Sequence, residues 1–218
     1  MKSFMKNSIM SVVSFLVLVF CSFGSQADDM KGVEYLQTRW AEIKYQMPEG
    51  EQEKAFTLLV AEAKQMRESH PTEAPYLIWE GIIRSTYAGA KGGLGALDEV
   101  KQAKKLFEQA IALAPESMMG SAYTSLGSLY YQVPGWPVGF GDEEKAKAML
   151  IKGLSYNPDG IDSNYFYADF LLDQKQYRQA LDTFEKALSA PPRPGRLLAD
   201  EGRKQEIEAG INRAKKHL

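Results

Sequence analysis

The chain has 218 residues, of which 44% are hydrophobic and 25% are charged, and its formal net charge is −2. These values are close to the averages of globular proteins, so they predict one domain with a hydrophobic core and exclude a disordered chain. The slightly acidic balance argues against nucleic acid as a partner, because that binding depends on concentrated positive charge.

The first 27 residues have the layout of a secretory signal peptide. Lys2 and Lys6 precede an apolar run over residues 9–23, and small residues follow up to a cleavage position after Ala27. An uncleaved anchor and a lipid anchor on Cys21 are the alternatives, although a bulky residue precedes this cysteine. We therefore expect an exported protein, periplasmic in the first place and otherwise secreted or anchored by an uncleaved signal. No later stretch is apolar enough to predict a membrane span after cleavage.

Residues 28–73 are predicted to form an N-terminal pair of helices. Two amphipathic stretches, 32–46 and 52–69, make up this pair. They lack the alanine and proline pattern of the following segments, so they are either a degenerate repeat or a cap.

Residues 74–192 contain three related units. The segments 103–115, 146–158 and 180–192 each begin with alanine and end with proline, and an aromatic-rich helix is predicted before each of them. Each has a large apolar residue four positions after the alanine and a small residue three positions later. A neighbouring helix can approach closely at the small residue. The large residues are Phe107, Leu150 and Phe184, and the small ones are Ala110, Gly153 and Ala187.

These units resemble the tetratricopeptide repeat, a helix-turn-helix of 34 residues that also has a small residue early in its first helix. Gly81, Gly127 and Ala168 fill that position here, and Ala146 and Ala180 stand 34 residues apart. The resemblance implies an all-α, right-handed helical solenoid of about nine helices. The charged segment 193–218 would then supply a C-terminal capping helix.

Two stretches exceed the repeat length and are predicted to be loops inserted within repeats. They cover residues 88–97 and 133–141, and equivalent loops of stacked repeats lie along one edge. In the second loop, Trp136 and Phe140 either line a partner-binding edge or fold back into the core. The stretch 133–142, V-P-G-W-P-V-G-F-G-D, also resembles an insert of small exported bacterial tetratricopeptide proteins.

The residues needed for common enzyme chemistry are scarce. His70 and His217 are the two histidines, and the chain would have no thiol after loss of Cys21. A zinc site, a cysteine nucleophile and a serine–histidine pair each lack ligands or a base. We therefore expect no catalytic residues, no metal and no cofactor, although a converging pair of carboxylates would reopen the question.

The concave groove that the resemblance implies would be lined by first-helix residues. Its hydroxyl, tyrosine and aspartate side chains suit a peptide held by hydrogen bonds and aromatic contacts. The repeats supply no lysine or arginine to this groove, so a neutral or basic segment is expected. The candidate partner-binding residues are Thr124, Ser128, Tyr131, Asp162, Tyr165 and Asp169.

The resulting functional prediction is an exported, non-enzymatic scaffold or adaptor. It would bind a protein or peptide through the groove and the loop edge. The alternative is a small-molecule binding component that assists a transport system. A closed apolar pocket behind Trp136 would favour the alternative, whereas an open groove would favour the adaptor.

Overall fold

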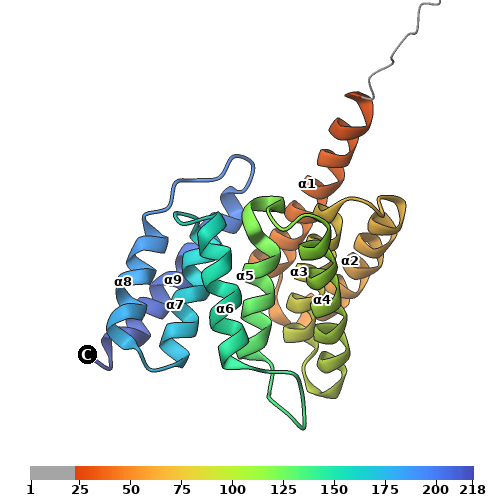
Figure 1. Ribbon diagram of the computed structural model, residues 1–218. Coiled ribbons are helices and arrows are strands. Elements are labelled where there is room, and N and C mark those ends of the chain that lie inside the picture. Colours follow the sequence, from red (N-terminus) through yellow and green to blue (C-terminus); the bar gives the residue numbers. More distant parts are fainter. Residues whose placement is uncertain (1–22) are drawn as a thin grey trace, which may run out of the picture.

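The computed structural model describes residues 23–218, with side chains described from Lys31 onward except that of Leu94. The predicted signal peptide lies mostly outside this range. The described part is all-α and consists of nine helices that pack in sequential order (Figure 1). They are α1 Phe23–Gln46, α2 Glu49–Ser69, α3 Ala74–Lys91, α4 Gly93–Leu113, α5 Ser117–Gln132, α6 Glu143–Tyr156, α7 Ile161–Asp173, α8 Tyr177–Leu188 and α9 Leu197–Lys215.

The helix pairs α3/α4, α5/α6 and α7/α8 correspond to the three predicted units. Their small residues lie where helices cross, as the pattern predicts. A Cβ atom on Gly81 would lie 2.5 Å from the ring of Phe107, and one on Gly127 would lie 2.7 Å from Leu150. Phe107, Leu150 and Phe184 are all at most 1% exposed. Close packing therefore depends on one small and one large residue at each crossing.

The prediction of an inserted loop at residues 88–97 is wrong. Residues 88–97 are almost entirely helical, because α3 continues to Lys91 and α4 begins at Gly93. Gly92 and Gly93 turn the chain with φ of 64° and 60°, a conformation that glycine adopts readily. The extra residues lengthen two helices, since alanine and lysine around the turn favour helix. The fold has one inserted intra-repeat loop in place of two.

Residues 133–142 do form the second predicted loop, between α5 and α6. Its backbone is tied down by hydrogen bonds from the Gly141 N–H to the Pro134 carbonyl (3.0 Å) and from the Asp142 N–H to the Tyr130 carbonyl (2.8 Å). Asp142 caps α6 by accepting a hydrogen bond from the Lys145 N–H (3.0 Å). The loop is therefore an ordered projection on the lower edge in Figure 1.

The two aromatic residues of this loop have different surroundings. Trp136 is 89% exposed, so the hypothesis that it fills the core is wrong. Phe140 is half-buried and packs edge-on against the ring of Tyr130, with 5.9 Å between ring centroids. One aromatic residue therefore anchors the loop while the other projects from it.

The last helix, α9, packs against the first helix, α1. A Cβ atom on Gly202 in α9 would lie 2.3 Å from the ring of Tyr45 in α1, so the two helices can approach only because residue 202 is glycine. Lys44 Nζ also lies 3.9 Å from Glu206 Oε1. This contact joins the two ends of the described helical array across its concave side.

Candidate functional site

A cavity of about 1070 Å³ lies on the concave side of the helices. Its size is near the upper end of typical ligand sites. Its wall is mixed, with indole, aliphatic and thioether groups from α1, α3, α4 and α5 beside hydroxyl groups of α5. The contributing residues include Trp40, Trp79, Ile82, Leu97, Met118, Ser121, Thr124, Ser125 and Ser128.

Four of the six predicted groove residues line this cavity, namely Thr124, Ser128, Asp162 and Tyr165. The two hydroxyl residues are deeply buried, with exposed fractions of 6% for Thr124 and 7% for Ser128. Ser128 Oγ donates to the Ser125 carbonyl over 2.8 Å, so its proton is already used within α5. The polar capacity of the cavity therefore depends mainly on other residues.

Tyr131 and Asp169 do not share that cavity. They lie in a separate depression near the ends of α5, α7 and α9. The Tyr131 hydroxyl donates to Asp169 Oδ2 (2.8 Å), and Arg213 Nη2 donates to Asp169 Oδ1 (3.0 Å). Burial and then the Asp169 charge raise the pKa of Tyr131 well above 10. These groups are engaged in joining helices, and Gln132 lines both the cavity and this depression.

Arginine residues that follow the three units in the sequence also line the cavity. Asp162 Oδ2 accepts from Arg193 Nη1 (2.6 Å) and its Oδ1 accepts from Arg203 Nε (2.8 Å). Arg193 also donates to Asp200, and Arg203 pairs with Glu206. The prediction that the groove contains no basic residues is therefore wrong. The repeat pattern misses them because they belong to the segment after α8 and to α9.

These contacts control the charge states in this part of the cavity. Burial by itself would raise the pKa of Asp162, but Arg203 and Arg193 outweigh it and hold that pKa well below its usual range. The Arg203 guanidinium lies 4.2 Å from the ring centroid of Tyr165. Burial raises the pKa of the Tyr165 hydroxyl to about 12. Asp162 is thus ionised and Tyr165 is neutral at physiological pH.

Arg196 differs from its two arginine neighbours. Its side chain makes no hydrogen bond or ion pair to any described residue, and its guanidinium carbon lies 5.0 Å from the ring centroid of Trp79. Its Nε and Trp79 Nε1 are the two buried side-chain polar atoms without a hydrogen-bond partner within the described range. Burial and then the nearby Arg193 lower the pKa of Arg196 to about 10. Arg196 is therefore a cation that still lacks a counter-charge in direct contact.

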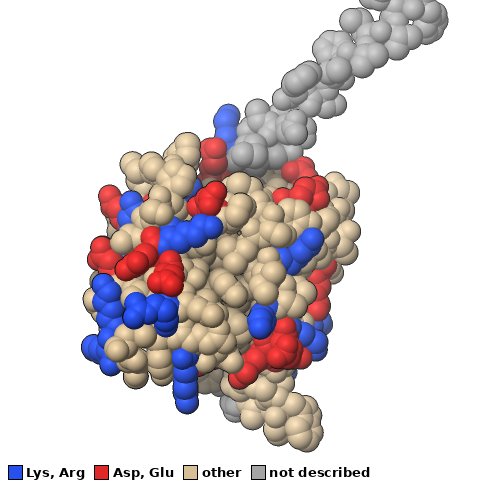
Figure 2. All heavy atoms as spheres, turned by 60° about the vertical axis from the view of Figure 1, so that its left-hand side comes forward, with Lys and Arg blue, Asp and Glu red and all other residues tan. Residues whose placement is uncertain are grey.

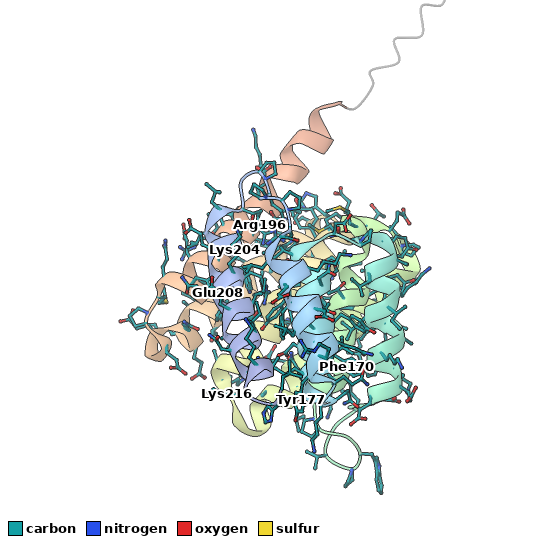
Figure 3. The ribbon with its side chains drawn as sticks, turned by 90° about the vertical axis from the view of Figure 1, so that its left-hand side faces the viewer. Phe170, Tyr177, Arg196, Lys204, Glu208 and Lys216 are labelled. Atoms are coloured by element: carbon teal, nitrogen blue, oxygen red, sulfur yellow. The ribbon has the colours of Figure 1, made fainter. Side chains whose placement is uncertain are left out.

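The position of Arg196 can be followed in Figure 3. It lies at the end of α9 beside α1, whereas Tyr177 and Lys216 lie at the opposite end of the bundle. Arg196 and the Tyr131 depression therefore lie at different ends of α9, while the cavity extends between them as far as Gln132. The outer face in Figure 2 carries acidic and basic side chains that are intermixed, with no extended patch of one sign.

The loop edge meets the cavity through its base. Pro134 and Val138 line one end of the cavity, as do Gly93 and Ala96 next to the α3–α4 turn. The turn and the loop thus share one edge, although the first of the two predicted loops is absent. Trp136 does not belong to the lining, so the cavity is not a closed pocket behind that residue, which is the observation that would have favoured the alternative function.

Neither a metal site nor a membrane-spanning helix is found among the described residues. No group of three or more histidine, cysteine, aspartate or glutamate side chains there has a geometry suited to a metal ion. No helix in the same range combines the length and apolar character needed to cross a membrane.

Comparison with known proteins gives a partial assignment. Residues 161–194 match the sequence profile of the family described as tetratricopeptide repeat. None of the curated proteins compared with the chain matches it significantly. Among solved structures, a mutant of MamA aligns with a TM-score of 0.44 and 21% identity over 88% of this chain and 99% of that one. MamA AMB-1 aligns with a TM-score of 0.43 and 21% identity over 87% of this chain and 92% of that one. MamA MSR-1 aligns with a TM-score of 0.43 and 20% identity over 86% of this chain and 97% of that one.

The sequence match coincides with the third predicted unit, which comprises α7 and α8 and the segment after them. This segment also contributes Asp162, Tyr165 and Arg193 to the cavity wall. The protein is therefore an all-α helical-repeat protein whose residues 161–194 match the tetratricopeptide repeat.

Proposed function

We propose that the protein acts after export as a non-enzymatic scaffold that holds a short segment of a partner protein in its concave cavity. The cavity of about 1070 Å³ carries this proposal, because it combines aromatic walls with polar groups along the inner side of a helical repeat. The tetratricopeptide match supports a role in protein interaction. The proposed export depends on the N-terminal sequence.

The contact between α1 and α9 limits the kind of partner segment that can fit in the cavity. Because Gly202 and Tyr45 meet across the concave side, the cavity is bounded where an open repeat array would continue as a groove. A chain end or a short extended loop suits such a site better than a long helix. The loop 133–142 would contribute its edge, with Trp136 as an exposed aromatic contact.

A cavity-filling variant tests this proposal directly. Ser125 is half-buried and lines the cavity from α5, so Ser125→Trp should fill part of it. Ser155 is exposed on α6, and Ser155→Trp provides the matched control. We expect Ser125→Trp to abolish partner binding while circular dichroism remains unchanged, and Ser155→Trp to bind normally.

The partner can be identified by cross-linking in cells. A photo-reactive residue at Ser121, within the cavity wall, should cross-link to a partner protein. The same residue at Leu58, which is 62% exposed on α2, should not give that product. A product that forms equally at both positions, or one that persists with Ser125→Trp, would contradict binding in the cavity.

The same enclosure favours a second candidate, a small-molecule binding component. Ligand sites of this size commonly enclose most of a small ligand. Native mass spectrometry of the protein purified from the compartment to which it is exported distinguishes the scaffold from the small-molecule binding component. A bound species of defined small mass, which is absent from Ser125→Trp, would favour the second candidate over the scaffold.

A further inference from the structure

Arg196 and Trp79 leave two adjacent hydrogen-bond donors without acceptors. Arg196 Nε and Trp79 Nε1 are both buried and both unpartnered among described residues. Neither group can accept a hydrogen bond, so they cannot satisfy each other. A buried donor without an acceptor is costly, which makes a ligand with acceptor atoms the complementary partner.

The outer nitrogens of Arg196 are placed differently from its Nε. They make no hydrogen bond to a described residue, and they are not among the buried unpartnered atoms. They therefore reach solvent or the cavity, which Arg196 lines. The guanidinium carbon lies 5.0 Å from the centroid of the Trp79 ring, so a cation–π contact holds this group beside the indole. This leaves a forked pair of N–H groups ready for a planar acceptor.

The charges around Arg196 favour a single negative charge. In the ion-paired network next to it, Glu206 pairs with both Lys44 and Arg203. Asp162 pairs with both Arg203 and Arg193, and Arg193 also pairs with Asp200. In this network, with Arg196 included, four cations face three carboxylates. Glu49 and Asp159 also line the cavity, and Asp159 is paired with Lys186. A monovalent carboxylate would balance this cluster, whereas a doubly charged phosphate would reverse its sign.

We propose that Arg196 and Trp79 form a subsite that binds a carboxylate group of the ligand in the cavity. This inference rests on the proposed binding function and adds the chemistry of the group that is recognised. It reverses the expectation from the repeats alone, which favoured a neutral or basic segment. The aromatic wall formed by Trp40 and Trp79 would contact an apolar group next to the carboxylate.

Indole N–H resonances offer a direct test. The chain has three tryptophans, so a nitrogen–proton correlation spectrum contains three indole signals, which single substitutions can assign. Phenylacetate serves as the probe, and phenylacetamide is the matched neutral control. We expect phenylacetate to shift the Trp79 signal saturably and phenylacetamide to bind at least about tenfold more weakly. The exposed Trp136 should not respond. Equal responses to the two probes, or no shift of Trp79 up to the solubility limit, would overturn the proposal.

Two substitutions assign the effect to Arg196. Arg196→Gln should weaken phenylacetate binding roughly tenfold, because it removes the charged fork. Arg178→Gln makes the same change at an exposed position of α8 and should bind like the wild type. Arg196→Lys keeps the charge without the planar fork and should bind with intermediate affinity. Unchanged binding in a folded Arg196→Gln variant would overturn the assignment.

Three short peptides distinguish the sources of the carboxylate. Acetyl-Ala-Phe with a free carboxyl end presents a chain terminus, and acetyl-Glu-Phe-amide presents an acidic side chain. Acetyl-Ala-Phe-amide has neither. A Trp79 shift with either of the first two supports the subsite and identifies the source, whereas an equal shift with the neutral peptide contradicts it. The cross-link from Ser121 reports on partner binding independently. If that cross-link persists in Arg196→Gln without loss, the scaffold proposal stands and the carboxylate subsite fails.

Discussion

Arg203 Nε in α9 donates a hydrogen bond to Asp162 Oδ1 in α7 over 2.8 Å. The two residues are 41 positions apart, and their contact joins the final helix to the third unit across the wall of the cavity. Arg193 donates to the other oxygen of the same carboxylate over 2.6 Å. Asp162, predicted from its place in the repeat as a partner-binding residue, therefore also holds the segment after α8 in position.

Asp162→Asn should lower the free energy of unfolding by about 1–3 kcal/mol, because it weakens two charge-assisted hydrogen bonds in a partly exposed site. Urea unfolding at neutral pH measures the change. Asp159→Asn is the control, since the Asp159 side chain is 80% exposed beside Lys186. A loss equal to that of the control would show that the arginine contacts contribute little to folding.

The same carboxylate should make stability depend on acid pH. The pKa of Asp162 in the folded protein is held below the value of about 3.9 expected in the unfolded chain. Its contribution is therefore present above about pH 4 and is lost as pH falls toward the folded pKa. We expect the stability difference between wild type and Asp162→Asn to shrink between about pH 5 and pH 2. A constant difference over that range would contradict this account.

Gly202→Val should disturb the closure of the cavity. Any side chain at residue 202 overlaps the Tyr45 ring, so we expect a loss of about 1–3 kcal/mol and a separation of α9 from α1. Gly50→Val is the matched control, because a Cβ there meets nothing within 4 Å. Thermal unfolding measures stability. A distance between spin labels on α1 and α9 reports the separation, and an unchanged distance would show that the contact adapts.

Trp136→Ala should leave the melting temperature nearly unchanged, with an effect below about 0.5 kcal/mol, because the side chain is 89% exposed. Phe140→Ala should cost more, about 1–3 kcal/mol, since Phe140 packs against Tyr130 and the neighbouring core. If the loop edge contributes to binding, Trp136→Ala will reduce the yield of the cross-link from Ser121 to the partner, although the variant is as stable as the wild type. Normal capture would leave the loop without a role in binding.

Tyr131→Phe should reduce stability by about 1 kcal/mol at neutral pH, because Asp169 loses one donor. The raised pKa of Tyr131 adds a pH effect. Stability from the protonated hydroxyl is complete below about pH 10, where an unfolded tyrosine titrates, and is lost as pH rises above it. Wild type should therefore lose more stability than Tyr131→Phe between pH 8 and pH 11.

Tyr123→Phe is the control for that measurement. The Tyr123 hydroxyl makes no hydrogen bond to a described residue, while its ring stacks on Tyr156. We expect little change in stability at pH 8. If both variants lose the same stability at that pH, the hydrogen bond from Tyr131 to Asp169 is not what stabilises the contact.

The helical fold follows from patterns that are local in the sequence. Alanine, a large apolar residue and a second small residue recur at fixed spacing, and this local periodicity specifies which helix face is buried and where a neighbour can approach. Gly81 against Phe107 and Gly127 against Leu150 follow from that pattern. The cap at Asp142 was also predictable, because a helix N-terminus is stabilised by residues next to it in the chain.

Which polar groups meet depends on how the helices pack in three dimensions. Residues 88–97 exceed the repeat length, but that excess does not say whether they form a loop or lengthen two helices, as they do. Arg193, Arg196 and Arg203 lie beyond the predicted units, and they reach Asp162 and Trp79 because α9 crosses to α1. Periodicity encodes contacts between adjacent helices, whereas a contact between the first and last helices depends on the accumulated geometry of every helix between them. The charge of the cavity was for that reason a property of the folded chain.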